Sequence, residues 1–281
     1  MTNYAAGSLH ARFDDFVDGS REALTLLERH LGQDAVRTAV AESRHAVPIV
    51  EPYLAGRNRI LEVGSGLGLL SGFLGSLGYD VTALEPGGIG YEERSILADL
   101  VPSDSSVDYR SSAIEDLDPS VEVPFDLIFS INVLEHVEDV HSALSAMKML
   151  LDNDGVMVHE CPNYTVPFEP HFGVPLVPFA PSRSRSILPS SIINTGLWAS
   201  LNFITARDVR RSADQLGLSA DFEPALLARS LDRLNDDPEF RQRHQWLGKV
   251  AAGLQRLGIT KALSQLPAGA ATPMIFRLQQ T

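Results

Sequence analysis

The feature that most constrains the fold is a glycine-rich turn between two apolar stretches. Residues 60–68 read ILEVGSGLG, in which Glu62 interrupts the first apolar run and glycines occupy positions 64, 66 and 68. Glycine reaches backbone angles that other residues avoid, and it lets a ligand approach the main chain closely. The stretch LLSGFLGSLG follows at once. The pattern therefore predicts a strand, a nucleotide-binding turn and a helix in succession.

Size and composition favour a large buried core and exclude several classes of protein. The 281 residues are 44% hydrophobic, enough for one elaborated domain or two modest ones. The single cysteine excludes an internal disulfide, and no apolar run is long enough to span a bilayer. A net charge of −13 argues against nucleic acid as a partner, because phosphate backbones attract clustered Lys and Arg. We therefore expect a cytoplasmic protein without a membrane span.

Charge is distributed unevenly along the chain. Acidic side chains predominate in residues 1–182, whereas basic side chains predominate in residues 183–281. The simpler interpretation is that the C-terminal part has solvated, arginine-rich helices. The alternative is that an anionic group of a substrate docks near Arg183 and Arg185.

Hydrophobic periodicity divides the chain into elements. Residues 13–55 show helical spacing, and Pro48 and Pro52 interrupt the later part of this helical region. From residue 58 strands and helices alternate. Strands are expected at RILEV, DVTALEP, VDYRSSA, FDLIFSIN, GVMVHECP, SADFE and TPMIFRLQQ, and helices at LLSGFLGSLG, IGYEERSILADLV, HSALSAMKMLL and TARDVRRSADQLGL. This order predicts an α/β fold with a doubly wound, mostly parallel, seven-stranded Rossmann-like sheet, which binds ligands at the carboxyl ends of its strands.

Three segments elaborate the predicted sheet. Residues 1–56 are expected to form an N-terminal helical lid, and residues 57–281 the Rossmann-like domain. Within that domain, residues 162–202 hold seven prolines and several aromatic residues. A loop of this length in a compact domain is usually functional or disordered, and its aromatic residues argue for order. We therefore expect a substrate loop at 162–202 and a helical insertion at 226–265.

The glycine turn does not fit a dinucleotide site, because Leu69 stands where the third glycine of GxGxxG would lie. Its pattern is ExGxGxG, and Glu85 ends the second strand 21 residues after Gly64. SAIEDLD, FDLIFSINVLEHVED and NFITARDVRRSADQLGL follow in that order. Together these landmarks resemble the class I S-adenosylmethionine-dependent methyltransferases, in particular a small-molecule branch with an LEHV motif after strand four. The resemblance covers residues 40–160 by motif, and residues 201–220 more loosely.

The resemblance implies S-adenosylmethionine as the cofactor and assigns residues to its parts. Gly64 and Gly66 would pass beneath the methionine part, with Gly68 easing close packing. Glu62 would help to hold the ammonium group, and its alternative role is that of a strand-end acid that caps backbone amides. Glu85 would bind both ribose hydroxyls, because a carboxylate accepts hydrogen bonds and donates none.

The resemblance also assigns positions around the adenine and the amino acid end of the cofactor. Ala113 and Ile114 align with positions that frame adenine, although the family often carries Asp where Ala113 stands. The exocyclic amine is therefore expected to bind Glu115 or a backbone carbonyl. Ile131 matches a position whose backbone touches the amino acid end. Arg44 lies where some related O-methyltransferases have a cofactor-contacting arginine, and the alternative is a surface helix arginine.

Methyl transfer from a sulfonium has a neutral leaving group, so the protein supplies alignment and a base for the nucleophile's proton. His136, in LEHVED, matches a histidine common in the small-molecule branch, with bracing of its loop as the alternative role. His159 ends the fifth strand beside Glu160, and strand alternation lets one of the two face a pocket. His171 lies in PNYTVPFEPHFGVP beyond that strand, where it would act as a base or bond a loop carbonyl.

The remaining sequence features limit the reactions that the protein is expected to catalyse. No group of His, Cys and Asp has metal-ligand spacing, so no metal is expected. SINV replaces the DPPY or NPPF tetrad of amino-methylating enzymes, which favours transfer to an oxygen of a small-molecule acceptor without excluding nitrogen or carbon. One rival is a non-catalytic S-adenosylmethionine-binding protein of the same fold. Another, a nicotinamide-dependent oxidoreductase, is disfavoured by Leu69 and Glu62.

Overall fold

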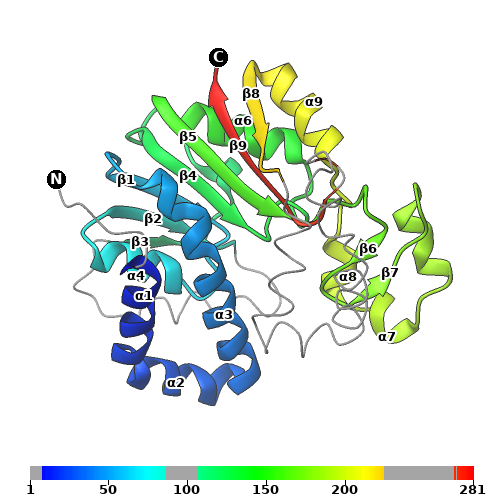
Figure 1. Ribbon diagram of the computed structural model, residues 1–281, viewed down its shortest axis with the longest axis horizontal. Helices are drawn as coiled ribbons and strands as arrows, with labels where there is room; N and C mark the ends of the chain where they lie inside the picture. The colour runs from blue at the N-terminus through cyan, green and yellow to red at the C-terminus, as the bar shows by residue number, and fades with distance from the viewer. Residues whose placement is uncertain (1–7, 87–106, 225–268, 270) are drawn as a thin grey trace, which may run out of the picture. The chain divides into compact units, whose positions relative to one another are not determined.

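The computed structural model describes residues 8–86, 107–224, 269 and 271–281, and among these residues seven strands form one sheet (Figure 1). The strands are β1 (Arg59–Val63), β2 (Asp80–Leu84), β3 (Val107–Arg110), β4 (Phe125–Ile131), β5 (Leu151–Cys161), β8 (Leu218–Phe222) and β9 (Met274–Gln280). Their order is β3-β2-β1-β4-β5-β9-β8, so the last strand of the chain inserts between β5 and β8. The predicted α/β fold with a seven-stranded, doubly wound sheet is confirmed.

The strand order reverses at β1, which pairs in parallel with β2 on one side and with β4 on the other. Ile60 is in register with Val81 of β2 and with Leu127 of β4, and all three side chains are fully buried. Ligands of such sheets bind beyond the carboxyl ends of the strands at the point of reversal. The glycine turn follows β1 and Ile131 ends β4, so both lie at this point.

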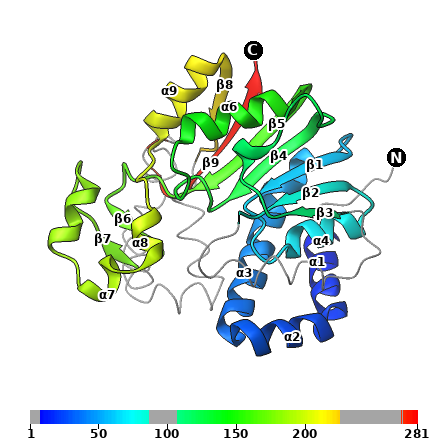
Figure 2. The ribbon, with the colours of Figure 1, turned by 180° about the vertical axis from the view of Figure 1, so that it is seen from behind.

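The chain divides into two compact units, and the first contains the residues up to Ile131 together with 142–158. Its helices are α1 (Ser8–Gly19), α2 (Arg21–Leu31), α3 (Gln33–Val50), η1 (Glu51–Tyr53), α4 (Leu69–Ser76), η2 (Ile114–Asp116) and most of α6 (Val140–Leu150). Figures 1 and 2 show α4 and α6 flanking the sheet. Phe13 of α1 and Phe73 of α4 meet edge to face, with ring centroids 5.2 Å apart. Leu27 of α2 joins a second buried cluster with α3 and α4.

Pro48 does not interrupt the N-terminal helices as its residue type predicted. α3 continues through Pro48 to Val50, and Pro52 lies in the following helix η1. Proline inside a helix cannot donate to the carbonyl four residues earlier, and its ring crowds that carbonyl, so its neighbours must hold the turn. Its neighbours Val47 and Ile49 are buried, and their packing holds this turn in place.

The second unit contains residues 132–141 and the described residues from His159 to Gln279. Its proline-rich segment folds into β6 (Phe168–Glu169), β7 (Val174–Pro175), η3 (Pro181–Ser186), α7 (Ser190–Ile193) and α8 (Gly196–Ser200). β6 and β7 pair antiparallel as a separate two-stranded sheet. Trp198 lies against Phe172 and Phe203, with ring centroids 6.3 and 5.7 Å apart. These aromatic contacts give the proline-rich segment its own small core.

The helix that follows this segment is capped at both ends. α9 (Ala206–Leu216) begins after Thr205, whose hydroxyl accepts a hydrogen bond from the amide of Asp208. The carboxylate of Asp208 accepts in return from the amide of Thr205, which completes a capping box. Gly217 ends the helix in the left-handed conformation, with φ of 65°. The threonine-led helix expected in NFITARDVRRSADQLGL is therefore present.

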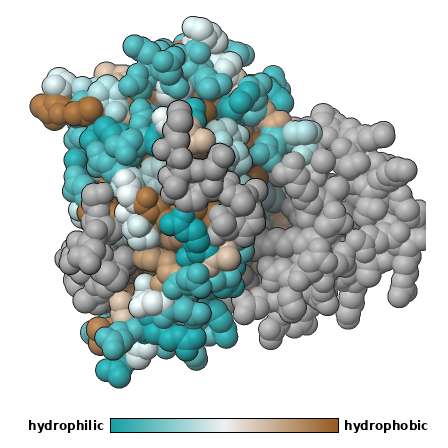
Figure 3. Space-filling model, turned by 60° about the vertical axis from the view of Figure 1, so that its left-hand side comes forward, coloured by the Kyte–Doolittle hydropathy of each residue, from teal (hydrophilic) through white to brown (hydrophobic). Residues whose placement is uncertain are grey.

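Two expected helices, at residues 89–101 and 226–265, lie outside the described residues. Among the helices that the structure describes, none has the length and apolar character needed to cross a membrane. Figure 3 shows hydrophilic residues over most of the described surface on one face, with smaller hydrophobic areas between them. Scattered exposed hydrophobic side chains are normal on a protein surface, so they indicate no docking face.

Candidate functional site

The glycine loop after β1 is fixed to the end of β2 by hydrogen bonds. The amides of Gly64 and Ser65 both donate to the carbonyl oxygen of Leu84, at 2.8 and 2.9 Å. Gly64 and Gly66 have φ of 74° and 55°, in the left-handed region that favours glycine. The amide of Gly66 donates to Oε2 of Glu85 at 2.7 Å. The acid that ends β2 is therefore already positioned against the glycine loop.

A cavity of about 330 Å³ lies between the glycine loop and α3 in the first unit. This volume is at the lower end of the range of small-molecule sites. The cavity is lined by Leu31, Asp34, Ala35, Thr38, Ala39, Glu42, Ser43, Ala46, Glu62, Gly64, Ser65, Gly66, Leu67, Leu70 and Ile131. Four of the predicted cofactor residues are thus brought together here, namely Glu62, Gly64, Gly66 and Ile131.

Glu62 is a buried acid in the wall of this cavity. It is 6% exposed and accepts a hydrogen bond from the hydroxyl of Ser71 in α4. Burial raises the pKa of Glu62 to about 8; the bond from Ser71 opposes this shift, and the charge of Glu85 adds to it. A cationic group in the cavity would lower this pKa again, because an opposite charge favours the ionised carboxyl. The cavity wall is therefore suited to an ammonium group.

Other predicted cofactor residues lie at the edges of β2 and β3. Gly68 has φ of 69°, and a Cβ there would overlap the ring of Tyr109 in β3. Ala113 and Ile114 lie just beyond β3, where η2 begins, and Ile114 is 2% exposed. The structure thus places Ala113 and Ile114 in the first unit, after the strand that pairs with β2.

Arg44 is not among the residues that line the cavity, although it lies in α3. Its guanidinium pairs with the carboxylate of Asp14 in α1, at 2.7 Å, and both side chains are nearly half exposed. An exposed ion pair of this kind contributes little to stability. The arrangement is that of a surface helix arginine, and contact with the cofactor stays a prediction.

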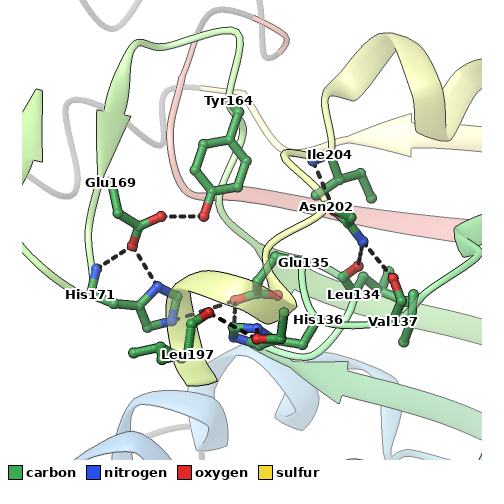
Figure 4. Close-up of polar contacts among 11 residues, drawn as sticks. Leu134, Glu135, His136, Val137, Tyr164, Glu169, His171, Leu197, Asn202 and Ile204 are labelled. Atoms are coloured by element: carbon green, nitrogen blue, oxygen red, sulfur yellow. Dashed lines mark hydrogen bonds and ion pairs between the residues drawn. The ribbon is translucent and has the colours of Figure 1, made fainter. Parts of the chain in front are cut away.

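A second group of polar side chains surrounds Glu169 in the second unit (Figure 4). The buried carboxylate of Glu169 accepts from the hydroxyl of Tyr164 at 2.5 Å, and from the backbone amide and Nδ1 of His171, each at 2.7 Å. Burial and the adjacent Glu169 raise the pKa of Tyr164 far above its ordinary value, so its hydroxyl remains a donor. Because a carboxylate only accepts, Nδ1 of His171 carries a proton, and Nε2 is the nitrogen that can exchange a proton.

His136 lies beside His171, with ring centroids 5.3 Å apart. Nδ1 of His136 is 2.8 Å from Oγ of Ser200, and this hydroxyl donates to the carbonyl oxygen of Leu197 at 2.9 Å. Burial lowers the pKa of His136 to about 4, and the neighbouring His171 acts in the same direction. His136 is therefore neutral at physiological pH.

Asn202 fixes the segment that carries His136. Nδ2 of Asn202 donates to the carbonyl oxygens of Leu134 and Val137, at 2.7 and 2.9 Å. Its backbone amide donates to the carbonyl oxygen of Glu135, also at 2.9 Å. One residue thus satisfies three carbonyls of the turn that follows β4, which restrains the direction of the side chains there.

Glu135 is fully buried beside the two histidines. Its Oε1 lies 3.8 Å from Nε2 of His136 and 3.8 Å from Nε2 of His171. Burial raises the pKa of Glu135 to about 8, an effect that the adjacent His171 opposes. Sequence reasoning missed Glu135, although its place before His136 in LEHVED was an available signal. Glu169 and Tyr164 could be recognised from the sequence only as neighbours of His171.

His159 is not brought together with the other two predicted histidines. It is fully buried in β5, with its ring centroid 5.3 Å from that of Phe276 in β9. Burial lowers the pKa of His159 to about 3. Glu160 is also buried, so alternation along β5 does not turn one of the two toward solvent, because both faces of this strand are covered. His159 has the surroundings of a core residue.

Comparisons with known sequences identify the domain. Residues 33–221 match the family model described as a methyltransferase domain. An uncharacterized protein from Mycobacterium tuberculosis is 32% identical over 228 residues, which is 78% of each chain. The ubiquinone biosynthesis O-methyltransferase of Rhodopseudomonas palustris is 34% identical over 100 residues, covering 36% of this chain and 38% of that protein.

Solved structures show the same fold. Phosphoethanolamine N-methyltransferase 2 from Haemonchus contortus, in complex with S-adenosyl-L-methionine, matches with a TM-score of 0.57 and 15% identity. The match covers 92% of this chain and 60% of that one. An S-adenosylmethionine-dependent methyltransferase from Mesorhizobium loti matches with a TM-score of 0.53 and 14% identity, over 84% of this chain and 97% of that one. Since the family model spans most of the chain, this protein belongs to the class I S-adenosylmethionine-dependent methyltransferases.

Proposed function

We propose that this enzyme transfers the methyl group of S-adenosylmethionine to an oxygen atom of a small-molecule acceptor. The observation that carries the proposal is the orientation of His171 by the buried carboxylate of Glu169. A hydroxyl nucleophile must lose a proton, and an oriented neutral imidazole is suited to accept it. The similarity to an O-methyltransferase over 100 residues supports the same acceptor atom.

The cavity of the first unit is proposed to receive the methionine part of the cofactor. When bound, S-adenosylmethionine supplies an electrophilic methyl group on a sulfonium. The carboxylate of Glu62 would hold the ammonium group, for which its buried position beside the glycine loop is suited. Glu85 accepts from the amide of Gly66, which holds its carboxylate beside the glycine loop, where it would accept hydrogen bonds from the ribose hydroxyls. Ala113 and Ile114 would frame the adenine.

The imidazole of His171 is proposed to take the proton of the acceptor. Nε2 of His171 would accept the hydroxyl proton that the acceptor loses when it is methylated. Nδ1 keeps its proton and its bond to Glu169, whose negative charge stabilises the imidazolium. Tyr164 donates to the other oxygen of Glu169 and so holds the carboxylate in place. In the sequence, His136 lies five positions after Ile131, the residue that ends β4 and lines the cavity.

The proposal predicts that His171→Asn separates catalysis from cofactor binding. The methyl acceptor would first be found by incubating the protein with isotopically labelled S-adenosylmethionine and metabolite extracts. We expect His171→Asn to lower kcat by about 10²–10⁴-fold, the usual contribution of a general base. Its affinity for the cofactor, measured by calorimetry, should change by less than about threefold, because Glu169 and His171 do not line the cavity.

The matched control is His30→Asn, which removes an exposed histidine of α2. If His171→Asn turns over as fast as the control, His171 has only a structural role. If extracts yield no labelled product while the cofactor binds, the non-catalytic alternative is favoured instead.

A finer proposal concerns the charge of the acceptor. Arg183 and Arg185 are exposed on η3, within the arginine-rich C-terminal part of the chain. They could bind an anionic group of the acceptor through charge-assisted hydrogen bonds. The double substitution of both arginines by serine should then raise KM for an anionic acceptor and leave kcat nearly unchanged. An unchanged KM would show that these arginines do not bind an anionic group of the acceptor.

A further inference from the structure

Three side chains of the second unit direct metal-ligating atoms toward one another. Oε1 of Glu135 lies 3.8 Å from Nε2 of both His136 and His171. The ligand atoms of all three residues lie within 4.8 Å of one another. Figure 4 shows Glu135 between the two imidazoles. Two imidazole nitrogens and one carboxylate oxygen therefore gather at a single place.

Hydrogen bonding determines which imidazole nitrogens present lone pairs there. Nδ1 of His171 is bonded to the carboxylate of Glu169, which can only accept, so this nitrogen carries the proton. Nδ1 of His136 is bonded to Ser200, whose hydroxyl donates its own proton to the carbonyl of Leu197. Ser200 therefore accepts from His136. Nε2 is therefore the nitrogen of each ring that is left to bind a cation, and it is the nitrogen nearer to Glu135.

The buried carboxyl of Glu135 is a second, independent indication of a bound cation. It is 0% exposed, and neither of its oxygens accepts a hydrogen bond from any other residue in the described part of the chain. A buried polar group without a hydrogen bond is costly, and a buried charge without a partner is more so. Two imidazole nitrogens thus meet a carboxyl to which no neighbouring residue donates a hydrogen bond. A bound cation is the partner that would satisfy all three at once.

We propose that Glu135, His136 and His171 bind one divalent transition-metal ion of the zinc type. Two imidazoles and one carboxylate form a ligand set of catalytic zinc sites, which keep a further position open for water or substrate. Zinc bonds of about 2.0–2.1 Å in a tetrahedral site place ligand atoms roughly 3.3–3.4 Å apart. The two carboxylate–imidazole distances of 3.8 Å exceed this spacing by about half an ångström, and no two of the three ligand atoms are more than 4.8 Å apart. Binding of zinc therefore needs the side chains to approach by roughly 0.5–1.5 Å.

The groups behind the two histidines fit a metal site as well. Metal-bound histidines donate their other ring N–H to a carboxylate, carbonyl or similar acceptor, which fixes the tautomer. Glu169 and Ser200 perform this task for His171 and His136. The site could not be recognised in the sequence because His171 lies 35 residues beyond His136, outside any short ligand motif. This proposal departs from the sequence-based expectation of no metal.

The metal site rests on the proposed function in that both use Nε2 of His171. A cation on Nε2 of His171 would use the lone pair that otherwise accepts the acceptor's proton. In the cation-bound protein the open position would instead hold the acceptor's oxygen and lower its pKa, as bound zinc does for water. Binding of the cation itself can be measured without any acceptor, so the two proposals can fail separately.

The test is a zinc titration of the full-length, tag-free protein after treatment with a chelator. Competition with a chromophoric chelator should show one Zn²⁺ per chain. Glu135→Gln keeps the size of the side chain and removes its charge, and His171→Asn removes one imidazole. Each should weaken zinc binding by at least about 100-fold, whereas the exposed-site control His30→Asn should bind as the unaltered protein does. Calorimetry with S-adenosylmethionine on the same samples tests the cofactor site separately.

X-ray absorption at the zinc edge supplies a readout that needs no variant. The unaltered protein should show two imidazole ligands at about 2.0–2.1 Å together with oxygen ligands. The proposal is overturned if the protein binds no stoichiometric zinc, if both variants bind as tightly as the control, or if the spectrum lacks two imidazoles. Intact cofactor binding in such a result would leave the methyltransferase proposal standing.

Discussion

Glu62 and Glu135 are both buried carboxyls with a pKa raised to about 8 by burial, yet their surroundings differ. Glu62 accepts from the hydroxyl of Ser71 and lines the cavity, and its role follows from its place before the glycine loop. Glu135 owes its surroundings to His171, which lies 36 residues further along the chain. Local sequence therefore identified Glu62, whereas the environment of Glu135 depends on tertiary contacts that no local pattern encodes.

The raised pKa of Glu62 predicts how the stability of the protein depends on pH. The folded protein binds the proton of Glu62 more tightly than the unfolded chain, whose carboxyl has the ordinary pKa of about 4.5. The contribution of Glu62 is therefore fully present below about pH 4.5 and is lost as pH rises through about 8. In Glu62→Gln, thermal unfolding should show a smaller fall in Tm between pH 6 and pH 9 than in the unaltered protein.

The control for this measurement is Glu22→Gln, which neutralises an exposed acid in the first turn of α2. Its curve of Tm against pH should run parallel to that of the unaltered protein. A Glu62→Gln curve that is parallel as well would contradict the raised pKa.

At the scale of elements, buried strands and capped helices were predictable and the packing of loops was not. RILEV coincides with β1 because its apolar run is bounded by polar residues and glycine. α9 begins at its threonine because the capping box is a local interaction. Pro48 was misjudged, since residue type alone does not reveal that the last helical turn is held by packing. The turn after β4 depends on Asn202, whose contacts span more than 60 residues of sequence.

Asn202→Ala should therefore affect catalysis beyond its effect on stability. Losing the bonds to Leu134 and Val137 frees the segment that carries Glu135 and His136, so kcat should fall by about tenfold or more. Thr205→Ala is the matched comparison, because it removes the cap of the neighbouring helix at a cost of about 1 kcal/mol. Measured side by side, both should lower Tm, and Asn202→Ala alone should lower kcat. Equal kcat in the two variants would assign Asn202 a purely structural role.

At the scale of the whole molecule, each compact unit holds one of the two sites. The first contains the cavity between the glycine loop and α3, and the second contains the cluster of Glu135, His136 and His171. The order of strands predicted the first site, because the ends of β1 and β4 meet where the strand order reverses. The second site could not be predicted, because it is built from two turns separated by β5 and α6.

Hydrogen exchange tests whether the N-terminal helical lid, expected at residues 1–56, also covers the bound cofactor. Addition of S-adenosylmethionine should slow amide exchange in α3 and in the glycine loop, both of which line the cavity. α9 contributes no residue to the cavity and should exchange at an unchanged rate. Exchange that slows in the loop but not in α3 would argue against a covering role for the N-terminal helices.

Calorimetric titration of S-adenosylmethionine into the unaltered protein, Glu85→Ala and Glu22→Ala tests the central claim most directly. If Glu85 binds the ribose beside the glycine loop, Glu85→Ala should weaken cofactor binding by about tenfold or more, since each hydrogen bond to a charged group is worth roughly 1.5–3 kcal/mol. Glu22→Ala, which removes an exposed acid, should bind as the unaltered protein does. Equal affinity in Glu85→Ala and the unaltered protein would contradict the assignment of the cofactor site.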